Sequence, residues 1–298
     1  MSCVVCGQTS DRVVWEENGY QGRMCECGTV YTSPEPAPGI VDPRNDHHSD
    51  AFYSTYALFK ARWVHRHRPN GRLLEIGCGE GHFLHAARSL GYDVAGVEAN
   101  PIRARRVRDW LGIEVRCSLL EELEWQGASF DVVYHCDLLS HFADPVGALQ
   151  KMSRLLAPGG MLIFEAGTLG GLHASWYHVV GELGFPHHRW LYSEESLRHL
   201  LKSAGLDVLG MRHFGLAPAV ATRRSRLLAA RFLHDVRKII RSFTKPASNG
   251  TPGPVQKQCN MLCDSIEQFI RYRIGRIAPR IGPATWLIAA RPRPEISA

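Results

Sequence analysis

Short apolar runs recur along the middle of the chain and are separated by segments long enough for a helix. The runs lie at residues 73–74, 94–97, 130–134 and 161–165. Runs of this length are typical of buried strands. Strands that alternate with helices predict an α/β fold, in which a doubly wound parallel sheet is covered by helices on both faces.

Capping residues mark the start of two of these helices. Asp144 precedes Pro145, and this pair predicts a helix start, because aspartate caps free N–H groups and proline suits the first helical position. Ser193 caps a second helix, whose first turn is acidic. The stretch 155–160 is rich in glycine at its end and is expected to form a turn after the first of these helices.

A glycine-rich turn follows the first strand. Gly77, Gly79 and Gly81 alternate with other residues, and a helical stretch begins at His82. Glycine lets the backbone approach a ligand closely, and a helix N-terminus points at that ligand. A dinucleotide fingerprint would need glycine at position 82. The shorter spacing suits a ligand without phosphates, such as S-adenosylmethionine.

Two carboxylates accompany this turn. Glu75 lies two residues before the first glycine, where it can attract the ammonium group of S-adenosylmethionine. Glu98 ends the second strand, 19 positions after Gly79 (98 − 79), where a carboxylate can accept both ribose hydroxyls. The alternative is an ordinary strand–turn–helix with surface acids.

With these motifs in view, the sequence resembles the class I S-adenosylmethionine-dependent methyltransferases of the small-molecule type. The resemblance covers about residues 52 to 215, with a final strand at 286–291. The matching stretches are LLEIGCGEG (73–81), VAGVEAN (94–100), FDVVYHCDLLSHFADP (130–145), LLAPGGMLIF (155–164) and HRWLYSEESLRHLLKSAGL (188–206). The resemblance implies a Rossmann-like sheet that binds S-adenosylmethionine.

The expected cofactor contacts follow from the motifs and from this resemblance. The family often carries an acidic residue after its third strand, and here Ser118 and a backbone amide take that place. An early tyrosine often reaches over the cofactor cleft, which makes Tyr53 a candidate, although plain aromatic packing explains it equally well. The expected contacts are Glu75, Gly77, Cys78, Gly79, Gly81, Glu98, Ala99, Ser118, Leu119, Tyr53 and His135.

Methyl transfer to oxygen or to an acidic carbon needs a general base, and histidine titrates in the right range. Candidates lie in loops after the strands, because open α/β sheets bind ligands at the carboxyl ends of their strands. The family commonly has a histidine five residues before the capping serine, and His188 holds that place. His141 is the second candidate, and Tyr177 and His178 complete the set; structural hydrogen bonding is the competing interpretation for each.

Four cysteines gather near the N-terminus. Cys3 and Cys6 form C-x-x-C, and Cys25 and Cys27 form C-x-C after 18 intervening residues (positions 7 to 24). Two cysteine pairs in tight turns, each followed by glycine, indicate a zinc ribbon, in which the metal replaces the core that a unit of about 30 residues cannot build. Because four cysteines would leave no open coordination position, the Zn²⁺ would be structural. A disulfide pair or unconnected thiols are the alternatives.

Charge is concentrated towards the C-terminus. Residues 216–298 hold 15 Lys and Arg and 4 Asp and Glu, whereas the whole chain has a net charge of +6. We expect a helical insertion at 216–283, which would form a lid, a homodimer surface, a membrane-surface patch, a seat for an anionic acceptor or simply a solvated basic face. The expected division is a zinc ribbon (1–33), a linker (34–50), a methyltransferase core (51–215), this insertion and a last strand with tail (284–298).

The N-terminal residues lack an export signal, and no apolar run approaches the roughly 18 residues of a membrane span. With nine cysteines, this favours reduced thiols and a cytoplasmic location. The sequence therefore predicts a C- or O-methyltransferase that acts on a small molecule, such as a natural-product intermediate or a nucleotide-linked sugar. An RNA base methyltransferase with a zinc-ribbon recognition module is the first alternative, although the ribbon is nearly neutral. A non-catalytic S-adenosylmethionine-binding scaffold is the second.

Overall fold

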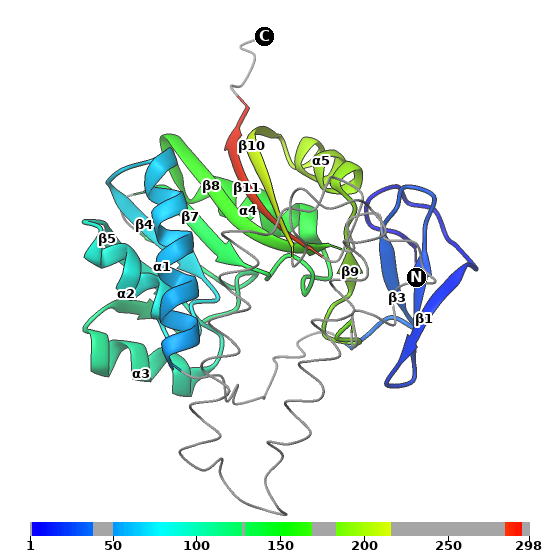
Figure 1. The fold of residues 1–298 in the computed structure, drawn as a ribbon, viewed down its shortest axis with the longest axis horizontal. Coiled ribbons are helices and arrows are strands. Elements are labelled where there is room, and N and C mark those ends of the chain that lie inside the picture. Colours follow the sequence, from blue (N-terminus) through cyan, green and yellow to red (C-terminus); the bar gives the residue numbers. More distant parts are fainter. Residues whose placement is uncertain (1, 38–49, 127–128, 169–182, 216–283, 294–298) are drawn as a thin grey trace, which may run out of the picture.

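The computed structural model describes residues 2–37, 50–126, 129–168, 183–215 and 284–293 (Figure 1). The expected insertion at 216–283 and most of the expected linker lie outside these ranges, as do Tyr177 and His178. The division of the chain into domains stays a prediction. No helix of the described ranges has both the length and the apolar character needed to cross a membrane.

A seven-stranded sheet forms the centre of the molecule, in the order β10-β11-β8-β7-β4-β5-β6. The strands from β6 to β8 pair in parallel, whereas β11 pairs antiparallel with both β8 and β10. The strands are β4 (Arg72–Ile76), β5 (Asp93–Val97), β6 (Glu114–Arg116), β7 (Phe130–Cys136), β8 (Leu156–Thr168), β10 (Leu206–Gly215) and β11 (Ala284–Pro292). The predicted Rossmann-like sheet is confirmed.

The direction of strand addition reverses beside β4. From β4 the chain adds β5 and β6 on one side and then returns to add β7 and β8 on the other. In open α/β sheets, ligands bind outside the carboxyl ends of the strands at such a switch point. The loops after β4, β5 and β7 are therefore the place to look for a site.

Five described helices accompany the sheet, which is buried on both faces. Successive residues of a strand point to opposite faces, so Leu73 packs in one apolar cluster with Ala57, and Leu74 in the other with Leu149. Both leucines are fully buried, and each such burial stabilises the fold by roughly 1.5–3 kcal/mol. The helices are α1 (Asp50–His67), α2 (His82–Ser89), α3 (Pro101–Leu111), α4 (Pro145–Arg154) and α5 (Glu194–Ser203).

Both predicted helix starts are confirmed. The Asp144 side chain accepts a hydrogen bond from Gly147 N at the start of α4, and Ser193 caps α5 through Ser196 N. The prediction that residues 155–160 form a turn is wrong, because β8 already begins at Leu156. Gly159 keeps a positive φ of 76° inside the strand, where the register with β7 shifts, so the glycines accommodate a bulge.

The N-terminal segment forms a second, four-stranded antiparallel sheet in the order β1-β2-β3-β9. Its first three strands are β1 (Val13–Glu17), β2 (Tyr20–Met24) and β3 (Val30–Ser33). The fourth, β9 (Trp190–Leu191), comes from the loop that precedes α5. The N-terminal sheet, hereafter the ribbon, therefore pairs directly with the core, and Figure 1 shows it beside β9 and α5.

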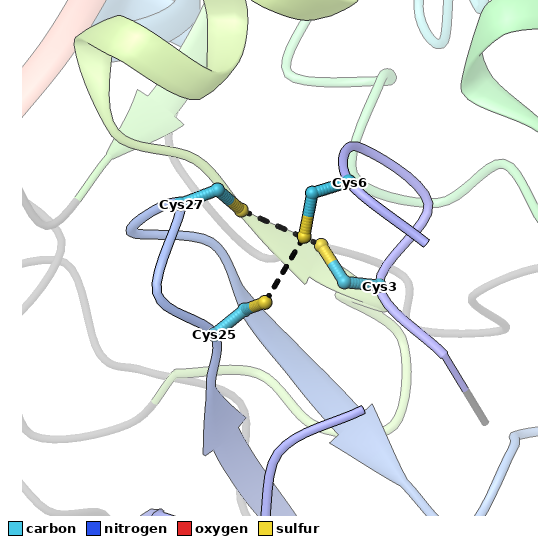
Figure 2. Close-up of side chains that lie close together, drawn as sticks. All are labelled: Cys3, Cys6, Cys25 and Cys27. Carbon is cyan, nitrogen blue, oxygen red and sulfur yellow. Dashed lines mark hydrogen bonds between the residues drawn. The ribbon is translucent and has the colours of Figure 1, made fainter. Parts of the chain in front are cut away.

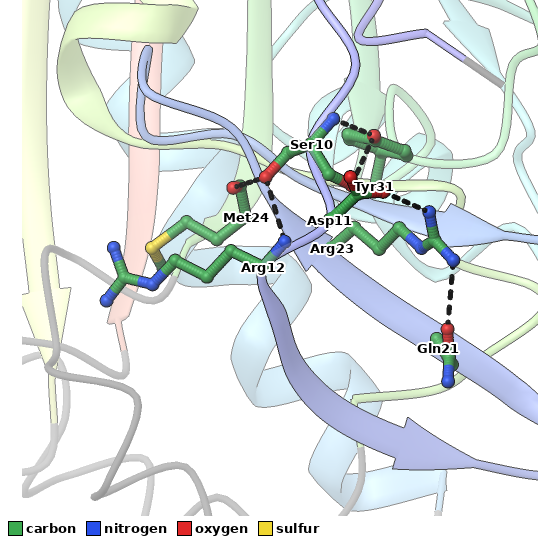
Figure 3. A network of polar contacts seen from close by, with 7 residues as sticks. All are labelled: Ser10, Asp11, Arg12, Gln21, Arg23, Met24 and Tyr31. Atoms are coloured by element: carbon green, nitrogen blue, oxygen red, sulfur yellow. Dashed lines mark hydrogen bonds and ion pairs between the residues drawn. The ribbon is translucent and has the colours of Figure 1, made fainter.

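A polar network connects the segments of the ribbon (Figure 3). The buried Tyr31 hydroxyl accepts a hydrogen bond from Ser10 N at 2.7 Å and donates to Ser10 O at 3.1 Å. The Ser10 hydroxyl donates to Met24 O at 2.6 Å, and Arg23 pairs with Asp11. These bonds connect the segment after Cys6 to β2 and β3, so the two cysteine-bearing stretches are held together by the chain itself.

Candidate active site and metal centre

The glycine turn after β4 has the backbone geometry that its sequence requires. Gly77, Gly79 and Gly81 all have positive φ angles, of 72°, 54° and 78°, which side chains rarely permit. A Cβ atom at Gly81 would lie 2.9 Å from Leu111 Cδ1, and one at Gly77 would lie 3.3 Å from Leu138 Cδ2. A Cβ atom at Gly79 would meet open space. Two of the glycines thus allow close packing, and the third leaves open space beside the main chain.

Glu75 is a buried carboxylate at the end of β4. Only 4 % of it is exposed, and its Oε2 atom has no hydrogen-bond partner within the described structure. Burial raises its pKa well above the ordinary value; Lys60 acts in the opposite direction, and Glu98 raises the pKa further. A buried carboxylate oxygen without a partner fits a cationic ligand group, because such a group would offset the cost of burial.

Glu98 connects the second strand to the glycine turn. Its Oε2 accepts a hydrogen bond from Gly79 N at 2.8 Å, and its Oε1 accepts one from Asn100 N at 2.8 Å. Each carboxylate oxygen can accept a second bond, so the residue keeps capacity for ligand hydroxyls. The two backbone bonds fix the orientation of the carboxylate at the switch point of the sheet.

The remaining predicted contacts fall into two groups. Ala99 follows β5, and Ser118 and Leu119 follow β6. The two segments lie near each other, as the distance of 3.9 Å between Cys117 Sγ and Ala99 O shows. Ser118 donates its hydroxyl to Leu119 O, and the Leu119 side chain is exposed. The cofactor roles of these three residues stay predictions.

Cys78, His135 and Tyr53 form the other group. Cys78 is buried against Gly96, and burial raises the pKa of its thiol. His135 is fully buried and stacks on Phe164, with ring centroids 4.7 Å apart, and burial lowers its pKa to about 3. The side chain of Tyr53, on α1, lies outside the described part of the structure. The cofactor roles of all three stay predictions.

The two histidines favoured as bases lie side by side. The ring centroids of His141 and His188 are 4.9 Å apart and the rings are nearly perpendicular. His141 belongs to the turn that follows β7, and Leu138 of the same turn contacts Gly77. Burial lowers the pKa of His141, the charge of His188 lowers it further, and Asp137 opposes both. A pair of imidazoles thus lies next to the loop that touches the glycine turn.

Sequence reasoning missed a buried charged network next to this edge of the sheet. Lys60 Nζ lies 2.5 Å from Glu165 Oε2 and 2.9 Å from Cys136 Sγ, and it stacks on the Tyr56 ring at 3.3 Å. The Tyr56 hydroxyl donates to the other oxygen of Glu165. Burial alone would lower the Lys60 pKa, but Cys136 and Glu165 raise it above its usual value. Glu165, an acid within the otherwise apolar run of β8, was the sequence signal that could have revealed the network.

The four N-terminal cysteines meet in one place (Figure 2). Their sulfur atoms all lie within 4.8 Å of one another, with Cys3 and Cys27 at 3.6 Å and Cys6 and Cys25 at 3.1 Å. Tetrahedral zinc with Zn–S bonds of about 2.3 Å places its ligands about 3.8 Å apart. The hydrogen bond between Cys3 and Cys27 lowers the pKa of Cys27 and raises that of Cys3, and burial raises the pKa of Cys25, so the protons of the metal-free cluster are shared unequally among its sulfur atoms. The donor set and spacing are compatible with a zinc ribbon.

Comparison with known families gives this geometry its context. The family described as "Methyltransferase domain" matches residues 47–210, which is more than half of the chain. The chain belongs to this family. The predicted class I S-adenosylmethionine-dependent methyltransferase is thus confirmed at the level of family. The matched region contains the glycine turn, Glu75, Glu98 and both histidines.

Several curated relatives of this chain share one name. A ubiquinone biosynthesis O-methyltransferase from Cereibacter sphaeroides is 31% identical over 150 residues, which is 46% of this chain and 60% of the relative. The enzyme of the same name from Maricaulis maris is 34% identical over 152 residues, which is 46% of this chain and 59% of the relative. The chain therefore spans about 60% of the length of these relatives.

Solved structures agree with the methyltransferase fold. A candidate sarcosine dimethylglycine methyltransferase from Galdieria sulphuraria has a TM-score of 0.51 at 17% identity, covering 78% of this chain and 85% of that one. A candidate methyltransferase from Bacillus halodurans has a TM-score of 0.50 at 18% identity, covering 79% of this chain and 99% of that one. At such identities the similarity concerns the fold alone.

Proposed function

We propose that this protein transfers a methyl group from S-adenosylmethionine to a hydroxyl oxygen of a small molecule. The observation that carries the proposal is the glycine turn between two oriented carboxylates, Glu75 with a buried oxygen in need of a cation and Glu98 with capacity for hydroxyls. The name of the curated relatives, O-methyltransferase, favours oxygen over carbon as the acceptor.

In this proposal Glu75 holds the cofactor's ammonium group, and Glu98 accepts hydrogen bonds from its ribose hydroxyls. The backbone near Ala99 and the rim at Ser118 and Leu119 receive its adenine. When bound, the cofactor supplies an electrophilic methyl group attached to a positively charged sulfur. The open space at Gly79 allows the main chain to lie close to the ligand.

His188 acts as the general base in this proposal. Its Nδ1 atom lies 2.9 Å from the carbonyl oxygen of Leu183, which can only accept, so Nδ1 carries the proton. The neutral ring then has its basic lone pair on Nε2. Nε2 would take the proton of the acceptor hydroxyl, and the bound cofactor would supply the methyl group to that oxygen and leave as its neutral thioether. His141 lies against the same ring and helps to hold it in place.

The ribbon is proposed to hold one structural Zn²⁺ through Cys3, Cys6, Cys25 and Cys27. Because all four positions of a tetrahedral ion would be filled by sulfur, the metal would stabilise the fold and take no part in methyl transfer. The close approach of the four sulfur atoms supports this assignment.

The proposal is tested by methyl transfer from cofactor labelled in its methyl group to a panel of phenols, polyols and nucleotide-linked sugars. His188→Ala should leave cofactor affinity unchanged and lower turnover by about 100-fold or more, as for loss of a general base. His85→Ala, at an exposed position on α2, is the matched control. Full activity in His188→Ala would exclude it as the base, and cofactor binding without transfer to any class of acceptor would favour a scaffold.

A further inference from the structure

The ribbon contacts the loop that carries His188 at three places. The tip of the β1–β2 hairpin bonds to residues 183–185, β3 bonds to residues 188–191, and the turn at Cys27 bonds to Ser193. This loop, residues 183–193, therefore lies along the ribbon from one end to the other. A spacer domain attached by a linker would not require such continuous contact.

The hairpin tip makes the most specific of these contacts. Glu17 accepts a hydrogen bond from Leu183 N at 2.8 Å through Oε2 and one from Gly184 N at 3.2 Å through Oε1. Asn18 donates its side-chain amide to Phe185 O at 2.8 Å. A carboxylate that accepts from two successive amides fixes both the position and the orientation of that peptide. Glu17 is thus bonded to a segment 166 residues away in sequence.

The middle of the ribbon holds the other side of the loop. Thr32 donates its hydroxyl to His188 O at 2.8 Å, and Thr32 N donates to Arg189 O at 3.0 Å. Tyr31 and Trp190 form a neighbouring antiparallel rung. The main chain of His188 is therefore fixed by β3, whereas the peptides that precede it are fixed by the hairpin tip.

Leu183 joins the hairpin tip to the imidazole. Its N–H donates to Glu17, and its carbonyl accepts from Nδ1 of His188 at 2.9 Å. His188 N also donates to Gly184 O at 3.0 Å, which closes the turn. If the Leu183–Gly184 peptide rotated, Nδ1 would lose its acceptor, and the ring would be free to carry its proton on either nitrogen.

We propose that the ribbon is a positioning element for the site and that Glu17 is its key positioning residue. Glu17 holds the Leu183–Gly184 peptide so that the Leu183 carbonyl keeps the proton of His188 on Nδ1 and leaves Nε2 basic. This inference rests on the proposed function for its effect on turnover. Its structural part, the control of the His188 tautomer by Glu17, stands independently.

The test uses the full-length, metal-loaded chain with Glu17→Ala, Glu17→Gln and, as matched control, Glu16→Ala. Glu16 lies on the same strand but is exposed and bonded to Gln21. Nuclear magnetic resonance of isotope-labelled histidine nitrogens reports which nitrogen of each ring carries the proton, and His188→Ala identifies the signal. We expect a single Nδ1–H form in the parent chain and in Glu16→Ala, and a mixture of both forms in Glu17→Ala.

Turnover and cofactor binding supply the second measurement. Glu17→Ala should reduce kcat by up to about 100-fold, the scale of a misplaced catalytic group, with cofactor affinity and metal content unchanged. Glu17→Gln keeps one accepting oxygen and should lose less. It also serves as the decisive variant if Glu17→Ala fails to fold, as judged by its thermal unfolding.

An unchanged His188 tautomer in a folded Glu17 variant would overturn the inference, as would equal losses in Glu16→Ala and Glu17→Ala. Failure of the proposed function looks different. In that case no acceptor would be methylated, or His188→Ala would retain activity, while the tautomer signal would still respond to Glu17.

Discussion

The main-chain N–H of Gly79 donates a 2.8 Å hydrogen bond to Oε2 of Glu98 and so joins the glycine turn to the end of the neighbouring strand. The bond brings together a turn and an acid that lie 19 positions apart (98 − 79) and that form one site in the proposed function. It also orients the carboxylate before any ligand arrives. Pre-orientation of this kind lowers the entropy cost of binding.

Glu98→Ala should weaken cofactor binding by about 100-fold, because two hydrogen bonds to a charged acceptor at about 1.5 kcal/mol each correspond to roughly two factors of ten. Titration calorimetry with S-adenosylmethionine or its demethylated product measures the change. Glu114→Ala, an exposed acid at the start of β6, is the control. Equal affinity of Glu98→Ala and the parent chain would refute the ribose assignment.

Cofactor binding should release protons in a way that depends on Glu75. Burial raises the pKa of Glu75 well above its usual range, so the free protein keeps a proton on this carboxyl up to a higher pH than an exposed glutamate does. A bound cation favours the ionised form, which lowers this pKa on binding. Affinity should therefore rise with pH through the raised pKa. Calorimetry in buffers of different ionisation enthalpy measures the protons released, and Glu75→Gln should abolish the release.

The same shift affects the stability of the free protein. A carboxyl whose pKa is higher in the folded state binds its proton more tightly there than in the unfolded chain. Stability should consequently fall as the pH rises from the ordinary carboxyl pKa through the raised one. Saturating cofactor should reduce this loss. Thermal unfolding of the parent chain and of Glu75→Gln, measured over this pH range, tests this. If the two chains showed the same pH dependence, the assignment would be contradicted.

Purified protein should contain about one zinc per chain. Cys6→Ser should lose the metal and destabilise the ribbon, because structural zinc supplies folding free energy to a unit with little core of its own. Elemental analysis and thermal unfolding check this. Cys117→Ser, at an exposed cysteine outside the cluster, should keep the metal. If the purified parent chain contained no zinc, the assignment of the cluster as a metal site would be wrong.

Lys60→Met should destabilise the protein by about 3–5 kcal/mol, because it leaves the buried carboxylate of Glu165 without its cation. The double variant Lys60→Met/Glu165→Leu should recover much of the loss, since two apolar side chains need no partner. Lys202→Met, at an exposed position on α5, should change stability by less than about 0.5 kcal/mol. Denaturant unfolding measures the free energy of unfolding of the three variants. If Lys60→Met had the stability of the parent chain, the ion pair would not be buried in solution.

Local signals determined much of this protein in advance. The glycine turn, the caps at Asp144 and Ser193 and the alternation of strands and helices each depend on residues close together in sequence. Backbone preferences and hydrogen bonds over three or four residues are therefore sufficient to predict them. The cysteine cluster was also visible, because ligand pairs in tight turns carry their own spacing.

Tertiary structure alone decided the relationships between distant residues. Neither the pairing of Lys60 with Glu165 nor the insertion of β11 between β8 and β10 leaves a periodic pattern, since each depends on which surfaces meet after folding. The bond from Leu183 to Glu17 is of the same kind. The sequence by itself predicted the glycine turn and the cysteine cluster, whereas the fold brought the ribbon to the loop that carries His188. Turns, caps and ligand spacings depend on residues that are close in sequence, but contacts between distant residues form only when the whole chain packs.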